Sequence, residues 1–167
     1  MSKIILRSEG TLCHILLMSQ SLANLMVHVV FNTKNRSEWI NSDIESRLFA
    51  YLRGIAENIN APIIEIGGMP DHIHLLMHLS RSITLANNIQ RLKTASSRFI
   101  KEIAPQLHDF SWQRGYGAFS VSPSSKLKVM NYIKNQKEHH LNGSFKDEFR
   151  ILLTKHEIHF DEKYLWD

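Results

Sequence analysis

The alternation of apolar and polar residues along the chain predicts a small α+β fold. Apolar residues at alternate positions, bounded by turn residues, indicate four strands: Met26 to Asn32, Pro62 to Ile66, His72 to Leu79 and Trp112 to Val121. Apolar residues at intervals of three and four indicate four helices: Ser42 to Ile59, Thr84 to Ile103, Ser124 to His140 and Ser144 to Lys155. This order is typical of a ferredoxin-like (split βαβ, RRM-like) fold, in which helices cover one face of an antiparallel sheet.

Turn and capping residues mark several boundaries between these elements. Ser42-Asp43-Ile44-Glu45 has the pattern of a capping box at the start of the first helix. The run Gly67-Gly68-Met69-Pro70-Asp71 predicts the turn of a hairpin, and Asn142-Gly143 predicts the end of the third helix. We expect a single domain over residues 18–167, preceded by an extension, residues 1–17, that is disordered or lies before a natural start at Met18.

Composition excludes several classes of protein. Cys13 is the single cysteine and cannot form an internal disulfide, so nothing points to an oxidising compartment. The apolar run over residues 12–18 is short and contains His14, which argues against a signal peptide, and no later stretch is long enough to span a membrane. We therefore expect a soluble, cytoplasmic protein with no membrane partner. The net charge of +4 favours a polyanionic partner, although a solvated basic surface explains it equally well.

Two histidines on the third predicted strand carry the first sign of chemistry. Alternation places Ile73, Leu75 and Met77 on a core face and His72 and His74 on the opposite face, roughly 6.6 Å apart along the strand. Two imidazoles at that spacing can reach one metal ion. The alternative is that the pair is accidental or merely exposed.

The third predicted helix adds further functional groups at helical spacing. Tyr132 and Gln136 are four residues apart, and His139 and His140 follow one turn later. Tyr132 could instead be a half-buried core residue, and Gln136 a solvent-facing helix former. Taken with the histidine pair, however, the combination suits cleavage of a phosphodiester by a tyrosine, because a metal ion can stabilise the charge that builds on the phosphate.

The motifs Pro70-Asp71-His72-Ile73-His74-Leu75-Leu76 and, over residues 132–140, Tyr132-Ile133-Lys134-Asn135-Gln136-Lys137-Glu138-His139-His140 together resemble the HUH single-tyrosine transposase family. Residues 27–36, 92–98 and 112–116 resemble it too, so that the likeness covers residues 18–167. Members of this family mobilise insertion sequences, or act on repetitive extragenic palindromes, by nicking and rejoining single-stranded DNA beside a hairpin.

The resemblance implies a role for each motif. Tyr132, on a C-terminal catalytic helix, would be the nucleophile that forms a covalent 5′-phosphotyrosine, and His72, His74 and Gln136 would bind Mg²⁺ or Mn²⁺. The two imidazoles would suit zinc or nickel as well, so the choice of ion rests on the family. It also implies a homodimer in which the tyrosine helix of one subunit can complete the site of the other.

Other residues are candidates for supporting roles. One of His139 and His140 could assist proton transfer or metal binding, or the pair could simply lie near a helix C-terminus, where the dipole favours it. Trp112 or Tyr116 could stack on an unpaired base. DNA phosphates could be contacted by basic and polar side chains, unless these form only a solvated face: Lys34, Arg36, Arg91, Lys93, Ser97, Arg98 and Arg114.

Two other functions fit the same residues. The first is a nucleic-acid-binding module of the same fold without catalysis. The second is a metal phosphodiesterase that uses water as its nucleophile, in which Tyr132 would be dispensable.

Overall fold

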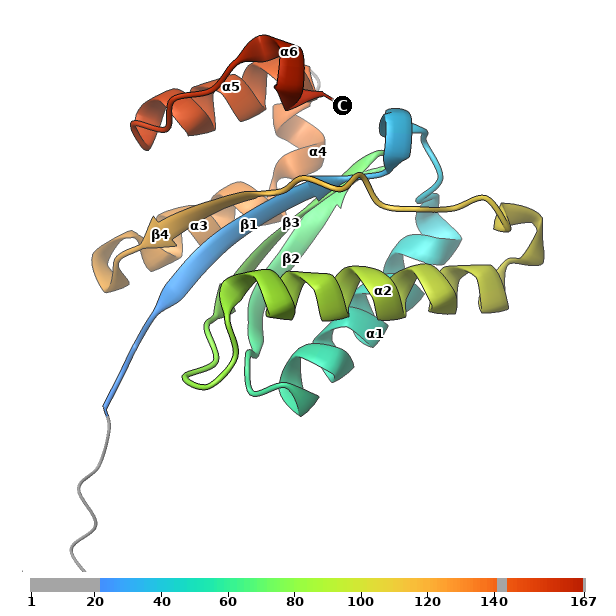
Figure 1. The fold of residues 1–167 in the computed structure, drawn as a ribbon, viewed down its shortest axis with the longest axis horizontal. Helices are drawn as coiled ribbons and strands as arrows, with labels where there is room; N and C mark the ends of the chain where they lie inside the picture. The colour runs from blue at the N-terminus through green and yellow to red at the C-terminus, as the bar shows by residue number, and fades with distance from the viewer. Residues whose placement is uncertain (1–21, 141–143, 167) are drawn as a thin grey trace, which may run out of the picture.

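The computed structural model describes residues 22–140 and 144–166 and contains a four-stranded antiparallel sheet (Figure 1). The strands are β1 (Met26–Asn32), β2 (Ile63–Met69), β3 (His72–His78) and β4 (Gly117–Val121), in the order β2-β3-β1-β4. This order, with β1 and β3 in the centre, confirms the predicted ferredoxin-like α+β fold. Three predicted features lie outside the described residues: the extension 1–17, the start at Met18 and the helix end at Asn142-Gly143.

Helices cover both faces of this sheet (Figure 1). The helices α1 (Ser42–Asn58) and α2 (Leu85–Ile103) pack on one face, while α3 (Lys126–Lys134), α4 (Gln136–His139) and α5 (Phe145–Lys155) lie on the other. A short helix, α6 (Glu162–Leu165), ends the described chain, and single 3-10 turns occupy Lys34–Arg36, Pro105–Leu107 and Pro123–Ser125. Within the described part of the chain, no helix is long and apolar enough to cross a membrane.

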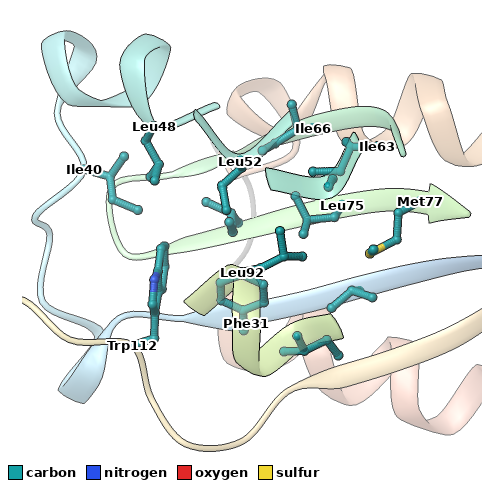
Figure 2. Packing of buried hydrophobic residues seen from close by; sticks show 14 of the residues in the cluster. Phe31, Ile40, Leu48, Leu52, Ile63, Ile66, Leu75, Met77, Leu92 and Trp112 are labelled. Atoms are coloured by element: carbon teal, nitrogen blue, oxygen red, sulfur yellow. The ribbon is translucent and has the colours of Figure 1, made fainter. Parts of the chain in front are cut away.

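The main hydrophobic core lies between the sheet and helices α1 and α2. Figure 2 shows Phe31 of β1 and Leu75 of β3 facing Leu52 and Leu92 of the two helices, and all four side chains are buried. Each such side chain contributes about 1.5–3 kcal/mol through burial. Trp112 closes one end of this core, where its indole N–H donates to Ser96 Oγ at 2.9 Å.

The first helix begins one residue earlier than the capping box predicts. Asn41 is the capping residue, because its side-chain oxygen accepts from the backbone N–H of Ile44 at 3.0 Å. Asparagine caps a helix as well as serine does, and the preceding Ile40 is buried in the core, which fixes the direction of the chain at this point. Ser42 is therefore the first helical residue.

The hairpin turn is shorter than predicted, because β2 continues through Gly67, Gly68 and Met69 and leaves only Pro70 and Asp71 to turn. The backbone of α3 explains the glycine at position 67. A Cβ atom there would collide with the carbonyl of Ile133, so glycine allows helix and strand to approach closely. Gly67 therefore serves packing of α3 rather than the turn.

Two other predicted boundaries were also wrong. The fourth strand begins at Gly117 rather than Trp112, which forms only an isolated bridge with Thr33. Carbonyls of the intervening loop accept hydrogen bonds from the Lys93 side chain instead of from a neighbouring strand. The third predicted helix is divided at Asn135, whose backbone (φ −97°, ψ 22°) leaves the helical region and separates α3 from α4.

Candidate active site

His72 and His74 project from β3 into the layer between the sheet and helices α3 to α5, as the alternation predicts. Both side chains are fully buried, and their ring centroids lie 5.2 Å apart. Within the described residues, neither Nε2 atom has a hydrogen-bond partner. Buried nitrogen atoms are rarely left in this state, so the pair is arranged to bind something between the two rings.

A different partner orients each of these rings. His72 donates from Nδ1 to the Asp71 carboxylate at 2.6 Å, and His74 Nδ1 lies 3.0 Å from Nε2 of His28 on the neighbouring strand. Burial, followed by the charge of His74, lowers the pKa of His28 to about 3, so His28 is neutral and can accept. The bond to Asp71 places a proton on Nδ1 of His72 and leaves its Nε2 lone pair free to bind a cation, while the contact with His28 fixes the orientation of the His74 ring.

Tyr132 and Gln136 reach the histidines because α3 packs against β2 and β3. Ile133 is fully buried against this face, and the close approach at Gly67 fixes the height of the helix above the strand. The ring of Tyr132 stands edge-on to that of His74, with centroids 6.0 Å apart. Gln136 is fully buried, and its Oε1 also lacks a partner among the described residues.

Glu148 of α5 lies at the centre of the site, although no sequence motif indicates it. Its carboxylate accepts from the Tyr132 hydroxyl, from Gln136 Nε2 at 2.9 Å and from His140 Nε2 at 2.9 Å. The signal that could have found it is its position on the apolar stripe of α5, three residues after Phe145 and four before Leu152. A charged residue on a buried stripe requires polar partners.

The close contacts shift the pKa of both the phenol and the carboxylate. Burial is the largest cause for Glu148 and would raise its pKa, but the contact with His74 at 3.5 Å and its charge, with the hydrogen bonds from Tyr132 and Gln136, lower it far below its usual range. Burial, the charge of Glu148 and the bond between the two groups raise the pKa of Tyr132. The phenol is therefore neutral in this state and requires activation before it can act as a nucleophile.

The two candidate auxiliary histidines differ in position. The His140 ring lies 4.7 Å from that of His72, and the residue joins the site through its bond to Glu148. His139 is exposed and packs beside the Tyr132 ring at 5.0 Å.

The predicted DNA-binding residues lie in two places, on the α2 side of the sheet and in the turn after β1. Arg91, Ser97 and Arg98 belong to α2, on the face opposite the histidines. Ser97, Lys93 and Arg114 line one groove together with Trp112 and Tyr116. Lys34 and Arg36 are exposed in the turn after β1, where the charge of Arg36 acts on Asp71.

The ammonium group of Lys93 is bonded to other groups of the same chain. Its ammonium group donates to the carbonyls of Gln113 at 2.8 Å, Arg114 at 3.3 Å and Gly115 at 2.6 Å. It also lies 4.9 Å from the centroid of the Phe31 ring. These contacts give Lys93 a structural role in anchoring the loop before β4.

The donor set fits a divalent metal ion. Of the buried side-chain atoms without a partner in the described residues, three belong to the ligands that the resemblance implies: His72 Nε2, His74 Nε2 and Gln136 Oε1. The rest belong to Asn88, on the other side of the sheet. In addition, ligand atoms of His72, His74 and Glu148 all lie within 4.8 Å of one another.

Comparison of the sequence with known proteins gives consistent matches. The family model for IS200-like transposases matches residues 21–136, more than half of the chain. The ISDra2 transposase TnpA of Deinococcus radiodurans is 27% identical over 117 residues, covering 67% of this chain and 84% of that protein. The transposase for insertion sequence element IS200 of Salmonella typhimurium is 29% identical over 121 residues, covering 69% and 78% of the two chains.

Solved structures give a similar result. A candidate transposase from Deinococcus radiodurans R1 superposes with a TM-score of 0.59 at 25% identity, covering 71% of this chain and 98% of that one. A REP-associated tyrosine transposase bound to a REP hairpin gives a TM-score of 0.55 over 74% of each chain. Its identity is 15%, so that this likeness shows the shared fold alone.

Proposed function

This chain belongs to the family of IS200-like transposases, and on that premise we propose that it cleaves and rejoins single-stranded DNA through a covalent 5′-phosphotyrosine on Tyr132. One observation carries the proposal: the hydroxyl of Tyr132 and the unpartnered atoms of His72, His74 and Gln136 converge on one buried site. The nearest alternative, a binding module without catalysis, gives no reason for this convergence.

The residues of the site divide the work of cleavage. His72, His74 and Gln136 would hold Mg²⁺ or Mn²⁺, while Asp71 and His28 keep the two rings in position. When bound, the ion supplies positive charge that stabilises the phosphate during attack and makes deprotonation of a nearby phenol easier. Zinc and nickel suit two imidazoles equally, so the site itself does not select among these ions.

The proposed reaction exchanges one phosphodiester for another. The Tyr132 oxygen attacks phosphorus and releases its proton, the bond from phosphorus to the 3′ oxygen breaks, and that oxygen takes up a proton. The aryl ester retains the 5′ phosphate, so a free 3′ hydroxyl can later attack it and restore the phenol. Joining therefore requires no external energy source.

The DNA partner is proposed to be a single strand that carries a hairpin. In its solved structure, a protein of the same fold is bound to a REP hairpin, and the exposed basic residues of this chain provide charge for phosphate contacts. Because Tyr132 lies beside His74 of its own chain, we propose that each subunit holds a complete site. A homodimer that exchanges its tyrosine helices is the alternative.

The test is covalent trapping. The protein is incubated with Mn²⁺ and a 3′-labelled hairpin oligonucleotide, because the fragment on the 3′ side of the cut stays on the tyrosine, and adducts are mapped by peptide mass spectrometry. We expect a nucleotide attached to Tyr132 and no adduct in Tyr132→Phe. If Tyr132→Phe cuts at the wild-type rate, water is the nucleophile, and if the wild type binds DNA without cutting it, the protein is a binding module. Either result contradicts the proposal.

A further inference from the structure

We propose that Glu148 is a further ligand of the metal ion, supplied by α5, which lies beyond the region that matches the family model. This inference rests on the proposed function, because it requires that His72 and His74 bind a divalent ion. Residues 21–136 of the family match include His72, His74, Tyr132 and Gln136 but not Glu148.

The two imidazoles and the carboxylate face one another at the distances of ligands that share an ion. His74 Nε2 lies 3.5 Å from Glu148 Oε1, and His72 Nε2 lies 3.8 Å from Oε2. The His72 ring carries its proton on Nδ1, against Asp71, so its Nε2 presents a lone pair to the carboxylate. Lone pairs of nitrogen and of a carboxylate repel each other at this separation unless a cation lies between them, and ligands about 2.0–2.3 Å from one ion lie at such distances from each other.

The charge of the ligand set also favours Glu148 as a ligand. The set formed by His72, His74 and Gln136 is electrically neutral, whereas hard divalent cations prefer oxygen ligands, carboxylates above all. The Glu148 side chain is 13% exposed, and burying a carboxylate costs free energy unless positive charge or hydrogen bonds compensate. A bound cation supplies that charge, and Glu148 supplies the negative charge that the other ligands lack.

The helix α5 is held in position by its capping residue and by hydrophobic contacts. Ser144 caps the helix by accepting from Asp147 N–H at 3.2 Å, and Phe145 packs against the His72 ring at 4.4 Å. Phe149 and Leu152 anchor the next turn against Val30 and Phe119 of the sheet. Glu148 therefore reaches the histidines from a helix held by its own hydrophobic cluster.

The position of Glu148 also links the ion to the nucleophile. The Oε1 atom of Glu148 accepts from both the Tyr132 hydroxyl and Gln136 Nε2, whereas Oε2, which faces His72, accepts from His140 alone among the described residues and keeps a lone pair for the ion. As a ligand, Glu148 would hold the phenol next to the ion.

The test measures Mn²⁺ affinity directly, by titration calorimetry of the protein without DNA. Glu148→Gln is expected to raise the Kd at least about tenfold, as loss of a ligand should exceed the usual effect of losing a supporting residue. Glu102→Gln removes the same charge from an exposed position on α2 and should leave the Kd unchanged. An unchanged Kd in Glu148→Gln overturns the proposal. So does faster cleavage, which would mean that the carboxylate merely fills the place of the substrate phosphate.

A second variant distinguishes the loss of a metal ligand from misfolding. Glu148→Asp retains the charge on a shorter side chain and should bind Mn²⁺ more tightly than Glu148→Gln, with thermal unfolding of the metal-free proteins recorded for both. Equal affinities in two folded variants would also overturn the proposal. If the wild type fails to bind Mn²⁺, or His74→Ala binds it as well as the wild type, the proposed function itself fails.

Discussion

The two faces of the same sheet differ sharply in chemistry. On the face covered by α1 and α2, strands β1 and β3 present apolar side chains such as Val29 and Leu75. On the face covered by α3 to α5, the same strands present His28, His72 and His74 among smaller hydrophobic clusters. Adjacent residues of one strand therefore belong to different parts of the molecule, one to the core and the other to the site.

This difference shows how a small domain protects a buried polar site. The site histidines are as deeply buried as the core, yet each polar atom is paired or directed at the proposed ion. The apolar face supplies most of the folding free energy, so the other face can tolerate polar groups that would be costly elsewhere. Substitutions on the two faces should therefore have different consequences.

The largest effect is expected from a pair of neighbours on β3. His74→Ala should abolish Mn²⁺ binding and lower the cleavage rate by roughly 10³-fold or more. Leu75→Ala should lower the free energy of unfolding by about 2–5 kcal/mol through loss of burial and formation of a cavity. Cleavage rate normalised to folded protein, together with urea unfolding, checks both variants.

Similar effects of His74→Ala and Leu75→Ala would contradict this division between the two faces of the sheet. A folded Leu75→Ala protein that has lost cleavage would show that the core face takes part in the chemistry. An active His74→Ala protein would show that cleavage does not depend on the proposed metal site.

A smaller effect is expected from the residue that orients His72. Asp71→Asn weakens the bond to Nδ1 and allows the other tautomer, so Mn²⁺ affinity should fall by about 10- to 100-fold. Asp109→Asn, at an exposed position, is the matched control. Calorimetric titration with Mn²⁺ measures both variants, and equal affinities would mean that the Asp71 bond does not support the ligand.

The smallest effect concerns Lys93, which lies on α2, away from the histidine face. Lys93→Met keeps the apolar stem but loses three bonds to carbonyls, so the free energy of unfolding should fall by about 1–2 kcal/mol. DNA affinity and its dependence on salt should stay as in the wild type. If Lys93 contacts phosphate instead, the slope of log affinity against log salt will decrease by about one. Lys101→Met, at an exposed position on the same helix, is the control for lost charge.

Much of the fold is predictable from sequence because its signals are local. Strand alternation over residues 72–78 correctly separates the core face from the histidine face, and Thr84 and Ser144 mark the helix starts of α2 and α5. The wrong boundaries depend on contacts between distant segments. Gly67 resembles a turn residue until α3 is placed against it, and the loop before β4 resembles a strand until Lys93 binds its carbonyls.

The residues of the site also fall into two groups: some are predictable from local sequence, and the others depend on how distant segments pack together. His72 and His74 form a pair within one strand, so their proximity follows from the pleat alone. Gln136 and Tyr132 lie one turn apart, but their approach to the histidines depends on how α3 and α4 dock. The partners of Glu148 are predictable only when the docking of α5 is known, because its local sequence indicates burial but does not identify the residues that it contacts.

Each chain is proposed to bring its own Tyr132 to its own histidines, and mixtures of two variant subunits distinguish this arrangement from an exchange of tyrosine helices. Tyr132→Phe and His74→Ala chains carrying different tags are co-expressed, purified and incubated with Mn²⁺ and labelled hairpin DNA. Wild type co-expressed with Tyr132→Phe is the positive control and should form an adduct on the wild-type chain. The mixture of the two variants should form no adduct on either chain. An adduct on the His74→Ala chain would show that its tyrosine acts at the partner's histidines and would contradict the claim.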